Sequence, residues 1–144
     1  MSSLQAVKWP LILVAALGTQ VYLLLADVIF VTYYAQLSNP GHEPAFYTMF
    51  AQETAGAFVF CFAPASIYLI ASWLCRRAGT APYLHATLYV AGYYVLDFAV
   101  IAAMAFDQMG ETLKLPFLLN GLAMLASALV AARLAGRRTA AVAG

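Results

Sequence analysis

Four long apolar stretches dominate the sequence, at about residues 10–35, 46–74, 82–106 and 115–135. Each is longer than the roughly 20 residues that an α-helix needs to cross the hydrocarbon core of a bilayer. The chain between them is short and leaves no room for a separate soluble domain. We therefore expect an all-α integral membrane protein in which residues 1–144 form a single four-helix transmembrane bundle.

The composition supports the same class of protein. Hydrophobic residues make up 65% of the chain and charged residues 9%, against roughly 45–50% and about 25% in soluble domains. A soluble chain this short could not bury so many apolar side chains, and the mean hydropathy is +0.84. A net charge of only +1 provides no basic surface for phosphates, so we expect a lipid bilayer and no nucleic acid as partner.

The prolines agree with these divisions. Pro10, Pro44, Pro82 and Pro116 each fall at the start of an apolar stretch, where a helix has no use for the missing N–H. Pro64 lies inside the second stretch, and there it predicts a kink. The first stretch is longer than the apolar part of a signal peptide, so we expect a retained helix.

Charge placement predicts the orientation. Six of the seven basic residues fall on the side that holds both termini and the second loop, namely Lys8, Arg76, Arg77, Arg133, Arg137 and Arg138. Because cytoplasmic loops carry an excess of Lys and Arg, both termini are predicted to be cytoplasmic. The compact chain favours a bacterial inner membrane.

Three carboxylic acids lie within the predicted spans, Asp27 in the first, Glu53 in the second and Asp97 in the third. Each costs roughly 2.5–3.5 kcal/mol near the bilayer centre, so such residues normally face the protein interior. Counting along the helices places all three in the outer half, together with Asn120 of the fourth span. Glu53 is the weakest member of the set, because it lies closest to the outer surface.

Helical spacing extends this pattern along two faces. Gln20 and Asp27 lie seven residues apart, and Tyr89, Tyr93 and Asp97 recur every four, so each set forms one stripe. We expect an outer-half pocket lined by Asp27, Asp97, Glu53, Gln20, Tyr93, Tyr89 and Asn120. Like-charge repulsion and burial would keep at least one acid protonated, while an ionised neighbour could hold a cation.

These features predict a protein that binds or transports a small hydrophobic or cationic molecule, with proton coupling through Asp27 and Asp97. One alternative is an intramembrane acid/base enzyme, an isomerase or cyclase, acting on a lipid-soluble substrate. Another is an accessory subunit of a larger membrane complex, whose acids meet basic residues of a partner. Four helices enclose little volume, so a transport pathway would require a homodimer.

Other chemistries lack the residues that they need. Cys61 and Cys75 are fourteen residues apart on one predicted helix, and about 21 Å of axial rise forbids a disulfide between them. His42 belongs to the outer loop and His85 to the cytoplasmic end of the third span, so they cannot ligate one haem. The chain carries no hydrolase, P-loop or dinucleotide-binding motif. We expect no metal and no cofactor.

Overall fold

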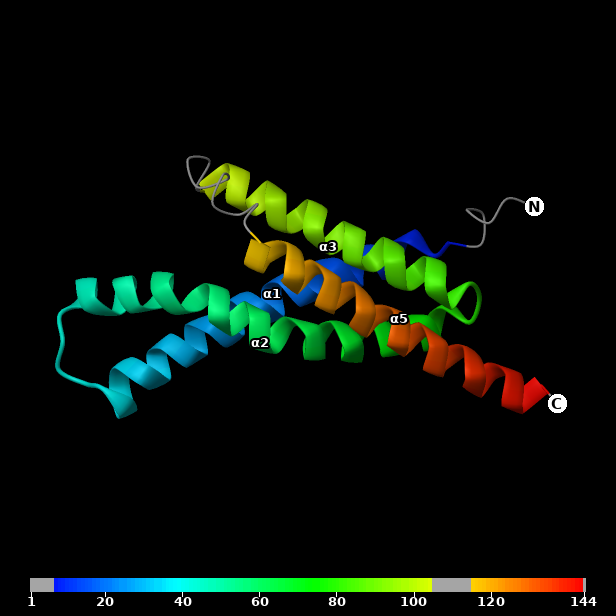
Figure 1. The fold of residues 1–144 in the computed structure, drawn as a ribbon, viewed down its shortest axis with the longest axis horizontal. Coiled ribbons are helices and arrows are strands. Elements are labelled where there is room, and N and C mark those ends of the chain that lie inside the picture. The colour runs from blue at the N-terminus through cyan, green and yellow to red at the C-terminus, as the bar shows by residue number, and fades with distance from the viewer. Residues whose placement is uncertain (1–6, 105–114, 144) are drawn as a thin grey trace.

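The computed structural model describes residues 7–104 and 115–143, and most of these residues lie in helices. The helices run alongside one another in alternating directions (Figure 1). Within the described residues, 4 helices are long and apolar enough to cross a membrane, as predicted. The elements are α1 (Trp9–Tyr33), the π-helical turn η2 (Tyr34–Ser38), α2 (Pro44–Ala78), α3 (Pro82–Met104) and α5 (Leu115–Ala143).

A proline lies in the first turn of each α-helix that the structure describes. Pro10 and Pro44 lie in the first turns of α1 and α2, Pro82 begins α3, and Pro116 is the second residue of α5. These positions have no intrahelical acceptor for an N–H, so proline costs nothing there. Helix α2 continues as one helix across Pro64.

Glycine and arginine define the end of α2, which extends beyond the predicted residue 74 to Ala78. Gly79 adopts a left-handed conformation with φ 72°, and its N–H donates to the carbonyl of Cys75 at 3.2 Å. Arg76 and Arg77 occupy the last turn, where positive charge complements the negative end of the helix dipole. Helix α5 likewise runs past the predicted residue 135, to Ala143.

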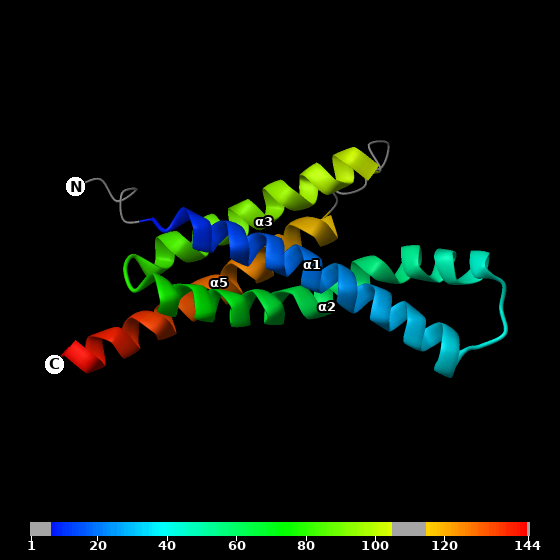
Figure 2. The ribbon, with the colours of Figure 1, turned by 180° about the vertical axis from the view of Figure 1, so that it is seen from behind.

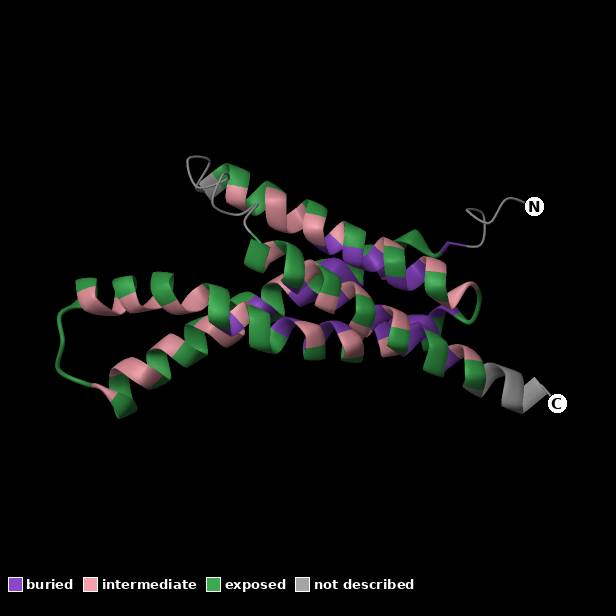
Figure 3. Ribbon diagram, viewed as in Figure 1, coloured by how far each residue is buried: buried purple, intermediate pink, exposed green. Residues whose placement is uncertain are grey.

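The buried core lies toward the end of the bundle that holds the α2–α3 turn (Figure 3). Its largest fully buried side chains include Tyr89, Ile67, Leu74 and Met124. Alanines fill most of the remaining positions, and such small side chains let neighbouring helices approach closely. Viewed from behind, α1 lies between α2 and α3 and contacts both (Figure 2).

The hairpin of α1 and α2 extends well past the ends of α3 and α5 (Figures 1 and 2). Helix α2 has 35 residues, a length of about 52 Å at 1.5 Å per residue. Aromatic contacts join the two arms where α3 and α5 no longer cover them. The rings of Phe30 and Phe58 are 5.3 Å apart, and those of Tyr34 and Phe50 are stacked at 3.8 Å.

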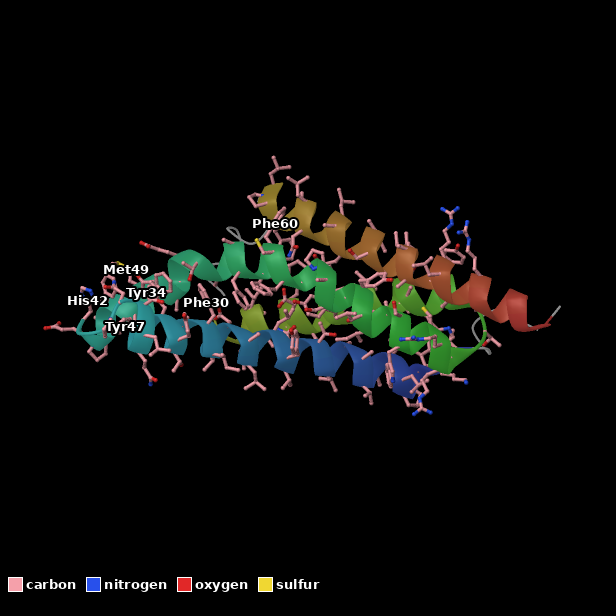
Figure 4. The ribbon with its side chains drawn as sticks, turned by 90° about the horizontal axis from the view of Figure 1, so that it is seen from below. Phe30, Tyr34, His42, Tyr47, Met49 and Phe60 are labelled. Atoms are coloured by element: carbon pink, nitrogen blue, oxygen red, sulfur yellow. The ribbon has the colours of Figure 1, made fainter. Side chains whose placement is uncertain are left out.

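Polar contacts hold the tip of the hairpin, where Tyr34, His42, Tyr47 and Met49 gather (Figure 4). The hydroxyl of Tyr47 donates to the carbonyl of Asn39 at 2.8 Å and accepts from the backbone N–H of His42 at 3.2 Å. The side-chain amide of Asn39 donates to the Tyr34 hydroxyl at 3.0 Å. The turn between the two arms is therefore closed by its own side chains.

The outer surface of the bundle is apolar. Along α1, Leu13, Leu17, Val21, Leu24 and Val28 are all more than half exposed. Soluble monomeric proteins rarely expose a continuous apolar surface of this size. The four apolar helices and their apolar outer surface indicate a multi-pass membrane protein.

Candidate functional site

A hydrogen bond joins two of the predicted site residues across α1 and α3. The side-chain N–H of Gln20 donates to a carboxylate oxygen of Asp97 at 3.1 Å. A second contact explains why these residues are level. The backbone N–H of Lys8 donates to Nε2 of His85 at 3.0 Å. Gln20 lies twelve residues after Lys8, and Asp97 lies twelve residues after His85. Because α1 and α3 run parallel, the second pair is brought together at the same distance along both helices.

Asn120 reaches the same level from α5. The next residue, Gly121, lies against the hydroxyl of Tyr94, so closely that an added Cβ would be 2.9 Å from that oxygen. Tyr94 is three residues from Asp97 on α3, a separation of about 4.5 Å along the helix axis. We call Gln20, Tyr93, Asp97 and Asn120 the polar layer.

Unpaired oxygens distinguish this part of the molecule. Among the described residues, three buried side-chain atoms have no hydrogen-bond partner: one oxygen each of Gln20, Asp27 and Asn120. All three are hydrogen-bond acceptors, and Asn120 is only 7% exposed. A buried acceptor without a donor costs about 1–3 kcal/mol, and two of the three, on Gln20 and Asn120, belong to the polar layer.

The two predicted tyrosines occupy different settings. Tyr89 is fully buried, and its hydroxyl lies 2.6 Å from that of Thr19 on α1. Because the Thr19 hydroxyl donates its one hydrogen to the carbonyl of Ala15 at 2.8 Å, Tyr89 is the donor in this pair. Tyr89 thus joins α1 to α3, whereas Tyr93 lies one helical turn nearer to Asp97 and is 3% exposed.

Two predicted acids lie outside the polar layer. Asp27 is seven residues beyond Gln20 on α1, about 10 Å further along the axis, although one of its oxygens is enclosed. Glu53 is exposed, in the part of α2 between Phe50 and Phe58, the residues that contact the last turns of α1. The structure therefore pairs Gln20 with Asp97 directly, and it separates Glu53 from them.

Tyr94 contributes to the packing of α3 against α5 beside the polar layer, and the sequence analysis did not include it among the site residues. Its hydroxyl donates to the sulfur of Met124 at 3.5 Å, and its ring meets that of Phe117 edge-on at 5.4 Å. Tyr94 is thus the contact that sets how closely α5 approaches α3 beside Asn120. The available signal was Gly121, a glycine next to an amide within an otherwise apolar helix.

A groove in the described part of the molecule lies away from the polar layer. It has a volume of about 240 Å³ and lies between α2 and α5, where Tyr68, Ser72 and Arg76 form part of its wall. None of the predicted site residues lines it.

The two histidines have different surroundings. The described residues contain no group of three or more His, Cys, Asp or Glu side chains that could hold a metal ion. His42 stacks on Phe46, with ring centres 4.2 Å apart, at the tip of the hairpin. His85 is fully buried, and its Nδ1 lies 3.0 Å from the carbonyl of Ala81, so each ring nitrogen has a hydrogen-bond partner, Nε2 with Lys8 and Nδ1 with Ala81.

Comparison of the chain with models of protein families, with curated proteins and with solved structures finds no match.

Proposed function

We propose that the protein binds a small organic cation that carries N–H donors, a protonated amine with an apolar body, at the polar layer in the outer half of the bundle. The observation that carries this proposal is the pair of buried oxygens without donors in the polar layer, on Gln20 and Asn120, next to the Asp97 carboxylate that Gln20 contacts. An ammonium group supplies up to three donors to such acceptors, and its charge suits a carboxylate.

The charge distribution favours a cation over an anion. Asp97 accepts a hydrogen bond from the neutral Gln20 amide, and the described basic residues, among them Lys8 and Arg76, belong to the opposite half of the bundle. A carboxylate in a low-dielectric interior requires a proton or a positive partner. Because a proton and a bound cation would each neutralise Asp97, binding of the cation would compete with protonation of this carboxylate. A proton-linked transporter uses this kind of coupling.

The membrane placement is part of the proposal. The basic residues at the termini and at the α2–α3 turn favour a cytoplasmic location for that end, in a bacterial inner membrane. The polar layer then lies toward the outer leaflet. Since four helices enclose little space, transport across the whole bilayer would proceed through a homodimer.

Isothermal titration calorimetry on the purified protein in mild detergent tests this proposal. The probes are phenylethylammonium and its N,N,N-trimethyl analogue, which has the same charge and aromatic body but no N–H donors. We expect the primary ammonium to bind at least about tenfold more tightly, since two or more additional hydrogen bonds at about 1 kcal/mol each are available to it. Equal affinities would refute the argument from unpaired acceptors.

Two substitutions locate the site. Asp97→Asn keeps the shape of the side chain and removes its charge, so phenylethylammonium affinity should fall at least about tenfold. Glu53→Gln is the matched control, because it removes a second carboxylate that is exposed. If the control weakens binding as much as Asp97→Asn, the cation is attracted by the overall charge and the polar layer is not its site.

A further inference from the structure

A groove lies between α2 and α5 in the half of the bundle opposite the polar layer. Its volume is about 240 Å³. Helix α2 contributes Tyr68, Leu69, Ser72 and Arg76, while α5 contributes Ala131 and Leu134 among others. Tyr68, Ser72 and Arg76 recur every four residues, so they follow one face of α2. The small side chains of Ser72 and Ala131 leave the space that larger residues would fill.

The groove combines apolar walls with a charged end. Leu69 is 65% exposed and Leu134 is 41% exposed, so both offer apolar surface to the surrounding bilayer. Arg76 is exposed in the last turn of α2, and its Nε donates to the carbonyl of Ser72 at 3.0 Å. This bond holds the guanidinium at the groove through Nε. The two Nη groups can then donate to the oxygens of a phosphate, whose geometry matches theirs.

The surroundings of Arg76 are positively charged. Arg77, Arg133 and Arg137 are exposed in the same half of the bundle. The acidic residues of the described ranges, Asp27, Glu43, Glu53 and Asp97, all belong to the other half. No carboxylate of the described residues therefore competes with an anion for Arg76.

We propose that this groove binds an anionic phospholipid of the membrane, with the headgroup phosphate at Arg76 and an acyl chain along Leu69 and Leu134. A soluble phosphate would meet the charge but leave the apolar walls uncovered, and a neutral lipid would cover the walls but add no net charge. An anionic phospholipid satisfies both features, and this assignment does not depend on what binds at the polar layer.

Native mass spectrometry of the full-length protein tests the proposal. The protein is released from a mild detergent that contains equal amounts of phosphatidylglycerol and phosphatidylcholine with the same acyl chains. We expect phosphatidylglycerol to be retained about fivefold more than phosphatidylcholine, the preference that one favourably placed basic side chain provides. Arg76→Gln should abolish this preference, and Arg77→Gln, its matched control, should preserve it.

A second variant tests the groove independently of charge. Ser72→Leu fills the space between α2 and α5 and should lower the retention of both lipids, with thermal unfolding confirming that the variant is folded. Equal effects of Arg76→Gln and Arg77→Gln would overturn the proposal, since the whole basic end would then attract lipid. Unchanged retention in Ser72→Leu, or displacement of the lipid by millimolar inorganic phosphate, would overturn it as well.

Discussion

Replacing Gly121 with alanine should separate α3 from α5 beside the polar layer. A Cβ at this position would lie 2.9 Å from the hydroxyl oxygen of Tyr94 and 3.3 Å from its Cζ. Tyr94 has little freedom to move away, because its ring contacts Phe117 at 5.4 Å and its hydroxyl donates to Met124 at 3.5 Å.

The expected magnitude follows from two opposing effects. Overpacking of this kind costs about 1–3 kcal/mol, while replacing a glycine inside a helix with alanine recovers up to about 1 kcal/mol. We therefore expect Gly121→Ala to lower the free energy of unfolding by about 1–2 kcal/mol. The measurement is unfolding of the detergent-solubilised protein by added SDS, followed by circular dichroism.

The chain offers a matched control and a rescue. A Cβ at Gly92 would meet Cβ of Ala16 at 3.8 Å, an ordinary contact, so Gly92→Ala should leave stability unchanged or raise it by up to about 1 kcal/mol. Adding Tyr94→Phe to Gly121→Ala removes the closest atom and should recover about half of the loss. If Gly121→Ala is as stable as the wild type, or if Gly92→Ala loses equally, the close approach of α3 and α5 is wrong.

Three further predictions concern single contacts. Gly79→Ala should destabilise the protein by about 1–2 kcal/mol in the same unfolding assay, because a Cβ is unfavourable at φ 72°; an unchanged midpoint would contradict the left-handed end of α2. Tyr89→Phe should cost about 1 kcal/mol through loss of its bond to Thr19, and little further loss should follow when Thr19→Val is added. Asn120→Leu should raise stability by about 1 kcal/mol, since it removes an unpaired buried oxygen, while weakening phenylethylammonium binding in calorimetry; tighter binding would exclude Asn120 from the site.

The last of these predictions separates stability from function. Polar residues that are retained without partners in an apolar interior reduce stability, so a binding role gives a physical reason for keeping them. A variant that becomes more stable and binds the cation less well would show this directly for Asn120.

The candidate site could be anticipated only in part. Helical spacing placed Gln20 on one stripe and Asp97 on another, but their hydrogen bond depends on how α1 and α3 are aligned along their axes. That alignment comes from contacts far apart in sequence, including Lys8 with His85 and Thr19 with Tyr89. Residue depth alone could not separate Glu53 from the other acids, because it does not report which face of α2 is covered.

The existence, number and approximate bounds of the helices were determined by the sequence itself. In an apolar solvent every backbone N–H and C=O must find an internal partner, so a sufficiently long apolar stretch has few choices besides a helix. Which side chains meet was decided by tertiary packing. The approach of Tyr94 to Gly121, the unpaired oxygen of Asn120 and the groove beside Arg76 all depend on how α5 packs against α2 and α3. Such packing reflects the shapes of many side chains together, and no local pattern along one helix encodes it.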